Sequence, residues 1–222
     1  MTPSPSAVLR ASAPWRETLS STGADVRIGS IRAFDTSAWL FYRCHESEWA
    51  RRTNAGAGAV ESLAVLDALM ELPEGLSVPI SGLPQRDRQM LREMPRATVH
   101  IGEGFVTRLF APAVTPLLAV VSGRGWSDGL ERASRFAPYC ARAVVVSALP
   151  QDEATALFNA SFYGIGVFES DGHEATMVVS PEDLPDWQPS PAWWLFCERM
   201  YRQLSRSAVK SSERRKEHHH PL

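Results

Sequence analysis

One stretch, residues 117–150, constrains what this chain can fold into more than any other part of the sequence. It opens with an apolar run at 117–121 that is too short for a helix and is ended by glycines. Four apolar residues then recur at helical spacing: Trp126, Leu130, Ala133 and Ala137. A second apolar run, rich in β-branched residues, follows at 144–146. The stretch therefore predicts a β-α-β unit, in which two parallel neighbouring strands are covered by the helix that joins them.

The residues in and after this unit also follow a recognisable order. The order runs through Trp126, Leu130, Arg132-Ala133, Arg135-Phe136, Leu149-Pro150 and Gly164-Ile165-Gly166-Val167. It resembles the core of bacterial PD-(D/E)XK nuclease-like proteins, where a strand carries Glu-x-Lys, a Trp follows the Lys, and the helix reads Leu-x-Gln-Ala-x-Arg-Tyr. The resemblance covers residues 98–180. It implies a restriction-endonuclease-like α/β fold with three layers, α/β/α, around a mixed central sheet of five or six strands.

The residues that would cleave a phosphodiester are missing from this pattern. The Glu position of the family falls on Val120, the Lys position on Ser122 and the helix Gln on Arg132. The family's metal-binding Asp is expected on the preceding strand, here 105–110, which contains no acid and has Arg108 in its middle. Cleavage in this family relies on carboxylates that hold a divalent cation and on a lysine that assists the attacking water. The resemblance therefore implies a pseudoenzyme.

We accordingly expect a non-catalytic protein without a cofactor, with a binding, regulatory or assembly role. Two alternatives stay open. An active nuclease with relocated ligands would hold Mg²⁺ or Mn²⁺ on Asp128, Glu131 and Glu103. A homo-oligomeric structural protein would instead bury an apolar interface that includes the C-terminal tryptophans, Trp187, Trp193 and Trp194.

Arginines would give a different chemistry to the cleft in which the nuclease family binds its metal ion. Ser122 with four arginines would bind phosphate or another anion directly: Arg108, Arg124, Arg132 and Arg135. The alternative is that Arg132 and Arg135 lie on the exposed side of an amphipathic helix.

A second basic feature lies near the C-terminus. Four cations recur at intervals of four residues: Arg202, Arg206, Lys210 and Arg214. On a continuous helix they form one stripe that can contact phosphates; the alternative is a solvated tail. The net charge of −2 and the pI near 6.3 provide no bulk attraction, so any nucleic acid must bind to such a local patch. We assign no catalytic role to the histidine tract at 218–220.

Length and composition predict the domain organisation. A chain of 222 residues suggests an N-terminal arm at 1–25, mobile because it is rich in Ser, Ala, Thr and Pro, and a single domain at 26–207. A basic tail follows at 208–222. The three cysteines are widely spaced, which indicates a reduced, cytoplasmic setting. The sequence has no secretion signal and no membrane-spanning run, so we expect no membrane partner.

Periodicity predicts the remaining elements. The predicted helices are 60–72, 84–94, 152–162 and 192–207, and the predicted strands are 98–101, 105–110, 164–168 and 175–179, of which the first two form a hairpin. Residues 28–42 indicate one extended segment. In the helix at 152–162 we expect Ala154, Leu157 and Phe158 to face inward.

Overall fold

The structure is a computed structural model that describes residues 5–13, 26–184 and 188–217, with side chains on the last helix described to Ser207. Its internal contacts group the chain into two compact units. The first unit comprises Met1–Arg43 and Pro116–Trp187, and the second comprises Cys44–Thr115 and Gln188–Leu222. Both units are discontinuous in sequence, and a single domain spanning residues 26–207 stays a prediction.

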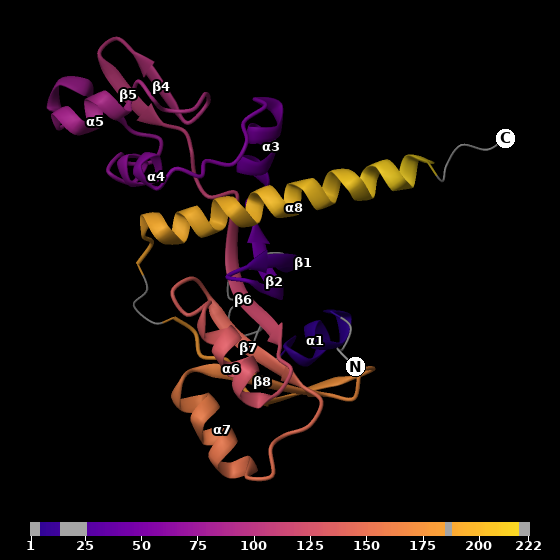
Figure 1. Ribbon diagram of the computed structural model, residues 1–222. Coiled ribbons are helices and arrows are strands. Elements are labelled where there is room, and N and C mark those ends of the chain that lie inside the picture. The colour runs from indigo at the N-terminus through magenta and orange to yellow at the C-terminus, as the bar shows by residue number, and fades with distance from the viewer. Residues whose placement is uncertain (1–4, 14–25, 185–187, 218–222) are drawn as a thin grey trace. The chain divides into compact units, whose positions relative to one another are not determined.

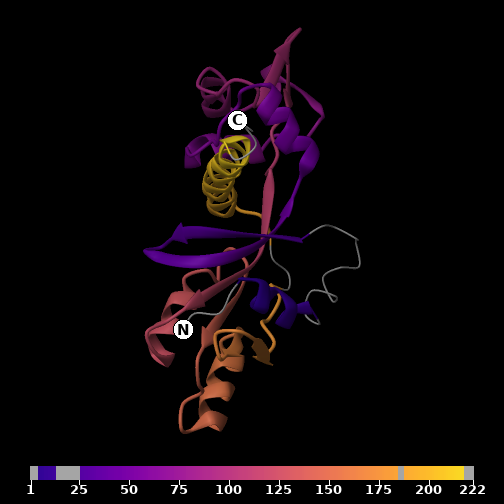
Figure 2. The same cartoon turned by 90° about the vertical axis from the view of Figure 1, so that its right-hand side faces the viewer.

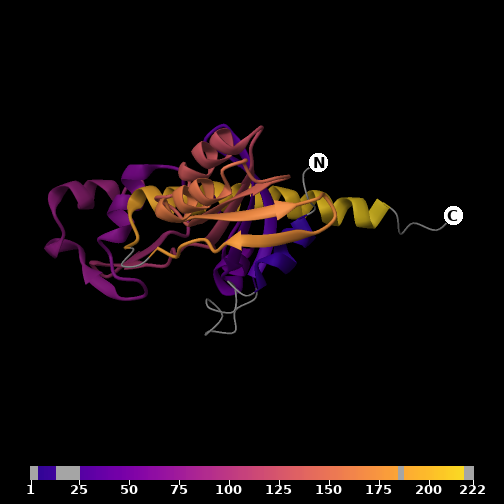
Figure 3. The same ribbon diagram turned by 90° about the horizontal axis from the view of Figure 1, so that it is seen from below.

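The first unit is built on a mixed six-stranded sheet, with strand order β1-β2-β6-β7-β8-β9. The strands are β1 (Val26–Ala33), β2 (Thr36–Cys44), β6 (Val114–Ser122), β7 (Ala141–Val146), β8 (Ile165–Ser170) and β9 (Ala175–Val179). Strands β6, β7 and β8 pair in parallel, whereas β1 with β2 and β8 with β9 pair antiparallel. Figure 3 shows β8 and β9 as two orange arrows that point in opposite directions. The mixed sheet predicted from the sequence is confirmed.

Helices cover both faces of this sheet. Helix α6 (Trp126–Ser134) approaches β7 so closely that a Cβ added to Gly129 would lie 2.5 Å from Val144 Cγ2. Helix α1 (Pro5–Ala11) places Val8 in an apolar cluster with Val145 and Val120. Neighbouring side chains on a strand point to opposite faces, so Val144 and Val145 place α6 and α1 on opposite sides of the sheet. The three-layer α/β/α arrangement and the β-α-β unit β6-α6-β7 are therefore confirmed (Figure 1).

The N-terminal arm contains structure that its composition did not predict. Ala7 and Val8 in α1 are only 1% and 0% exposed. They occupy core positions because the face of the sheet opposite α6 is apolar and has to be covered. Residues 1–4 and 14–25 of the arm lie outside the described residues.

The segment at 28–42 is a hairpin and not one extended strand. Ala33 pairs with Thr36, and the two residues between them, Phe34 and Asp35, have φ angles of 52° and 55°. Two consecutive left-handed residues form the tight turn that fits the twist of paired strands. Figure 2 shows this hairpin of β1 and β2 in indigo and purple. The sequence prediction was wrong because the turn lacks the glycine or asparagine that normally signals it.

Helix α7 (Glu153–Phe162) joins β7 to β8 and also differs from expectation. Its buried residues are Ala156 and Ala160, whereas Phe158 and Phe162 are 68% and 72% exposed. The expected inward face of Ala154, Leu157 and Phe158 is therefore wrong. Alanines let the helix approach the sheet closely, and the two phenylalanines lie on the solvent side, 6.3 Å apart between ring centroids.

The second unit contains a separate three-stranded antiparallel sheet, with strand order β3-β5-β4. Its strands are β3 (Ser77–Pro79), β4 (Val99–Gly102) and β5 (Phe105–Arg108), which confirms the predicted hairpin. One expectation is corrected, because β5 does not precede β6 in the larger sheet, where the neighbour of β6 on that side is β2. The strand expected to carry a metal-binding Asp thus belongs to another sheet.

Helices complete the second unit. They are α3 (Glu46–Asn54), α4 (Leu63–Met70), the short 3-10 helix η1 (Ile80–Gly82), α5 (Gln85–Met90) and α8 (Pro191–Glu217). Helix α4 packs against α8, and Leu72, Leu91 and Val106 form a small apolar core with residues around them. In the described ranges, no helix combines the length and the apolar character that a membrane span requires.

Candidate functional site

A small hollow lies beside the positions that would carry the nuclease residues. It measures about 150 Å³ and is lined by Ser30, Ser37, Ala38, Trp39, Val120 and Ser122. We call it the serine hollow. Val120 is 1% exposed and belongs to the apolar core of the sheet. The lining therefore offers hydroxyl and apolar groups, and it contains neither a carboxylate nor a cation.

Two of the proposed substitute metal ligands, Asp128 and Glu131, already accept hydrogen bonds from neighbouring residues. On α6, Asp128 accepts hydrogen bonds from the Arg124 backbone N–H at 2.8 Å and from Arg132 Nε at 3.0 Å. The first of these bonds, supported by the second, holds the pKa of the Asp128 carboxyl below its ordinary value. Glu131 accepts from Arg135 at 2.7 Å. Such contacts between residues four apart stabilise a helix surface.

Glu103, the third candidate, lies in the second unit at the turn between β4 and β5, with a φ angle of 53°. Asp128 and Glu131 belong to the first unit. Within the described ranges, no three His, Cys, Asp or Glu residues form a group able to hold a metal ion. Cys140 is fully buried, and this burial raises the pKa of its thiol to about 12. A thiol of that kind is not a nucleophile at neutral pH.

The arginines expected to share one cleft belong to different units. Arg124, Arg132 and Arg135 lie in the first unit, and Arg108 lies on β5 of the second. Arg135 also donates to the Phe34 carbonyl at 2.8 Å. Arg132 and Arg135 are partly exposed and paired with acids one turn earlier, as on the exposed side of an amphipathic helix.

The second unit contains a buried ionic cluster that sequence analysis did not find. It consists of Glu48 on α3, Arg52 on α3 and Glu198 on α8, and both Arg52 and Glu198 are 0% exposed. Arg52 Nη1 and Nη2 donate to the two Glu198 oxygens at 2.7 and 2.8 Å, and Arg52 Nε donates to Glu48 at 2.8 Å. Arg52 Nη2 also donates to the Ala111 carbonyl. Each nitrogen of this guanidinium is therefore hydrogen-bonded.

The surroundings of the ionic cluster complete its hydrogen bonding. Glu198 also accepts from the Val60 backbone N–H at 3.0 Å and from Trp194 Nε1 at 3.2 Å. The Arg52 guanidinium lies 3.8 Å from the centroid of the Phe110 ring. Burial alone would lower the pKa of Arg52, but hydrogen bonds and charge from Glu198 and Glu48 raise it. These ion pairs link α3 to α8.

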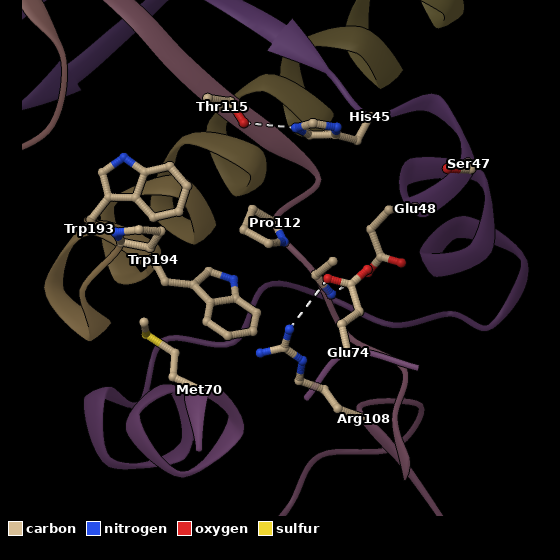
Figure 4. Close-up of a pocket in the computed structure, with 12 residues that line it drawn as sticks. His45, Ser47, Glu48, Met70, Glu74, Arg108, Pro112, Thr115, Trp193 and Trp194 are labelled. Carbon is tan, nitrogen blue, oxygen red and sulfur yellow. Dashed lines mark hydrogen bonds and ion pairs between the residues drawn. The ribbon is translucent and has the colours of Figure 1, made fainter. Parts of the chain in front are cut away.

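A larger pocket lies elsewhere in the second unit (Figure 4). It measures about 520 Å³ and is lined by His45, Ser47, Glu48, Met70, Glu74, Arg108, Ala111, Pro112, Thr115, Pro189, Trp193 and Trp194. We call it the tryptophan pocket. Its apolar walls come from both tryptophans, a methionine and two prolines. At its other end, His45 Nε2 and Thr115 Oγ1 lie 2.7 Å apart.

Arg108 is the cation of this pocket. Its Nη1 donates to the Leu69 carbonyl at 3.0 Å, and its Nη2 donates to Glu74 Oε2 at 3.3 Å. Its guanidinium lies 5.5 Å from the centroid of a Trp194 ring. Its Nε is buried and has no hydrogen-bond partner. Sequence analysis singled out Arg108, but nothing in the sequence linked it to Glu74 or Trp194.

The basic stripe borders a third hollow, which we call the α8 groove. The groove measures about 410 Å³ and is lined by Arg52, Thr53, Gly56, Ala57, Gly58, Ala59, Tyr201, Arg202, Ser205 and Arg206. Arg202 pairs with Glu61 at 2.6 Å, and Arg206 is exposed. The helical backbone continues through Lys210 and Arg214, whose side chains lie outside the described part of the chain.

Comparisons of this chain with protein-family models, with curated proteins and with solved structures gave no match. The PD-(D/E)XK resemblance consequently rests on the order of residues in the chain. What the chain does has to be argued from the serine hollow, the tryptophan pocket and the α8 groove.

Proposed function

We propose that this chain is a non-catalytic binding protein on a PD-(D/E)XK-like scaffold that has lost its cleavage residues. The serine hollow is the observation that carries the proposal. Val120 and Ser122 stand at the Glu and Lys positions of the resemblance, and their neighbours in the hollow come from β1 and β2. Phosphodiester cleavage of this type needs carboxylates around a divalent cation, and serines are poor ligands for one.

The α8 groove supports contact with a polyanion. Arg202 and Arg206 are four residues apart on one helix, and the small residues at 56–59 also line the groove. Small side chains let a phosphate backbone approach closely, and the arginines supply charge-assisted donors. Nucleic acid is the partner we propose for this groove.

Two further features bear on partners and location. Of the three tryptophans that a homo-oligomer was expected to use, Trp193 and Trp194 are only 6% and 3% exposed and contribute little to an external surface. Trp187 lies outside the described residues. Cys44, Cys140 and Cys197 form no disulfide. We propose a cytoplasmic location, which fits reduced thiols.

The first experiment tests cleavage. Purified protein is incubated with single-stranded and double-stranded DNA and RNA in the presence of Mg²⁺ or Mn²⁺. The proposal predicts no cleavage above that of a mock preparation. Metal-dependent cleavage that Asp128→Asn or Glu131→Gln abolishes would overturn it and would favour a nuclease with relocated ligands.

The second experiment tests the groove by measuring polynucleotide affinity at several salt concentrations. Loss of two phosphate contacts in the double variant Arg202→Gln/Arg206→Gln should lower the slope of log K against log salt by roughly two for duplex DNA. The matched control is Arg88→Gln/Arg92→Gln, two exposed arginines four apart in the same unit. Equal slopes for both double variants would refute binding in the α8 groove.

A further inference from the structure

We propose that the tryptophan pocket binds a small organic carboxylate with an apolar body. The ligand carboxylate takes the Nε–Nη2 edge of Arg108, which the Glu74 side chain partly occupies in its absence. This inference concerns the second unit alone and does not depend on the proposed loss of nuclease chemistry in the first.

The size and the walls of the pocket fit such a ligand. Small-molecule sites commonly measure about 300–1,000 Å³ and combine apolar walls with a few polar groups. The pocket measures about 520 Å³, and Trp193, Trp194, Met70 and two prolines supply its apolar wall. Figure 4 shows the guanidinium of Arg108 directed toward Trp194 and Glu74 at one end of this wall. A ligand with one charged end and an apolar body matches that arrangement.

The Arg108 edge is only half used. Nε and Nη2 are the two donors that bind both oxygens of a carboxylate side by side. Nη2 reaches one oxygen of Glu74 at 3.3 Å, whereas Nε is buried without a partner. A buried donor without an acceptor is unfavourable. A ligand carboxylate that reaches both nitrogens would accept the hydrogen bond from Nε that Glu74 does not accept.

Glu74 is easy to displace. Its side chain is 61% exposed, and its contact is longer than the roughly 2.7–2.9 Å usual for charge-assisted hydrogen bonds. Because the Glu74 end of this pair is mostly exposed, water solvates the carboxylate almost as well as Arg108 does, and the contact contributes little to stability. The Glu74 carboxylate can therefore turn to solvent when another anion arrives.

The charges of the pocket favour a monoanion over a cation or a phosphate. The Glu48 carboxylate is already bound by Arg51 and Arg52, so it offers little to a cation. A phosphate dianion would meet repulsion from Glu48 and Glu74, which both line the pocket. A single carboxylate replaces the Glu74 carboxylate on this guanidinium and meets less repulsion from the two glutamates than a dianion would.

Isothermal titration calorimetry tests the proposal with three carboxylates, benzoate, phenylbutyrate and decanoate, each compared with its neutral amide. At least one carboxylate should bind roughly tenfold to a hundredfold more tightly than its amide, as expected for hydrogen bonds to a charged group. Arg108→Gln should remove this preference. Glu74→Gln should increase carboxylate affinity severalfold, because it removes the competing charge.

The matched controls come from an exposed ion pair in the same unit, Arg86 with Asp67 at 3.2 Å. Arg86→Gln and Asp67→Asn should leave both the preference and the affinity unchanged. No preference for any carboxylate in the wild-type protein overturns the proposal, and so does a preference that survives Arg108→Gln. If Arg108→Gln fails to fold, Glu74→Gln decides, since its exposed side chain tolerates the change; unchanged affinity then overturns the proposal.

Discussion

The sheet of the first unit buries aliphatic and aromatic side chains around Val120, whereas the second unit buries an ionic cluster. Among the described residues, the buried charged side chains are Glu48, Arg52 and Glu198, and all three belong to the second unit. The serine hollow of the first unit has no charged lining residue, but the tryptophan pocket of the second has Arg108, Glu48 and Glu74.

This difference indicates which of the two units can bind a charged ligand. The hollow of the apolar sheet offers small hydroxyls and no charged side chain to a ligand. A unit whose core is fixed by a complete ionic cluster can hold a neighbouring arginine in place with part of its hydrogen-bonding capacity unused. Binding of charged ligands is therefore expected in the second unit, and the following changes test the contrast.

The largest effect is expected at Arg52. Arg52→Met removes the cation from between Glu48 and Glu198 and leaves buried carboxylates without their main donor. Breaking a buried ion pair on one side costs about 3–5 kcal/mol of unfolding free energy. Urea denaturation measures this loss, with Arg88→Met on the exposed surface as the control. A loss below about 1 kcal/mol would mean that the ionic cluster does not hold the second unit together.

A smaller loss is expected in the first unit at Gly123, which follows β6. A Cβ at this position would lie 2.4 Å from the Gly129 N and 2.5 Å from its Cα, so backbone would have to move. We expect Gly123→Ala to lower the unfolding free energy by about 1–3 kcal/mol. Gly58→Ala is the control, because its Cβ would meet nothing within 4 Å. Equal stability of the two variants would contradict the close approach of α6 to the backbone at Gly123.

Acid should weaken the second unit through Glu48. Burial alone would raise the pKa of this carboxyl, but hydrogen bonds and charge from Arg51 and Arg52 outweigh burial and lower it. The unfolded chain, with an ordinary pKa of about 4.3, then binds the proton more tightly than the folded chain. The stability that Glu48 contributes is present at neutral pH and is lost as the pH falls below about 4.3 toward the lowered value.

Urea denaturation between pH 7 and pH 3 checks this dependence on wild-type protein and on Glu48→Gln. The variant should be less stable at neutral pH, and the difference from wild type should shrink as the pH falls. A constant difference across the range would show that the Glu48 carboxyl does not contribute through its lowered pKa.

The smallest effect is expected on the outer face of α7 in the first unit. Phe158→Gln and Phe162→Gln should each change the unfolding free energy by no more than about 0.5 kcal/mol, because both rings are mostly exposed. Ala160→Leu on the buried face should instead cost about 1–3 kcal/mol through overpacking. If Phe158→Gln were the more damaging change, the orientation of α7 would be wrong.

The sequence predicted what depends on local periodicity. The β6-α6-β7 unit and the mixed sheet followed from short apolar runs around a helical pattern. The faces of α7 were mispredicted because Phe158 resembles a core residue by hydrophobicity alone. Which face of α7 is buried depends on how closely the helix packs against the sheet, and the hydrophobic periodicity of the sequence does not contain that information.

The second unit was harder to predict because its site depends on distant contacts. Arg52 and Glu198 are separated by 146 positions, and Glu74 by 34 positions from Arg108. The i,i+4 spacing of Glu48 and Arg52 was visible, but such pairs are usually exposed. The pairing of β5 with β3 also moved Arg108 away from the sheet in which the sequence analysis had placed it.

Hydrogen–deuterium exchange with and without phenylbutyrate tests most directly whether charged-ligand binding lies in the second unit. We predict slower exchange in peptides that contain Glu74, Arg108 or Trp194, and unchanged exchange at 118–122 beside the serine hollow. Slower exchange at 118–122 with no change in the second unit would contradict the account.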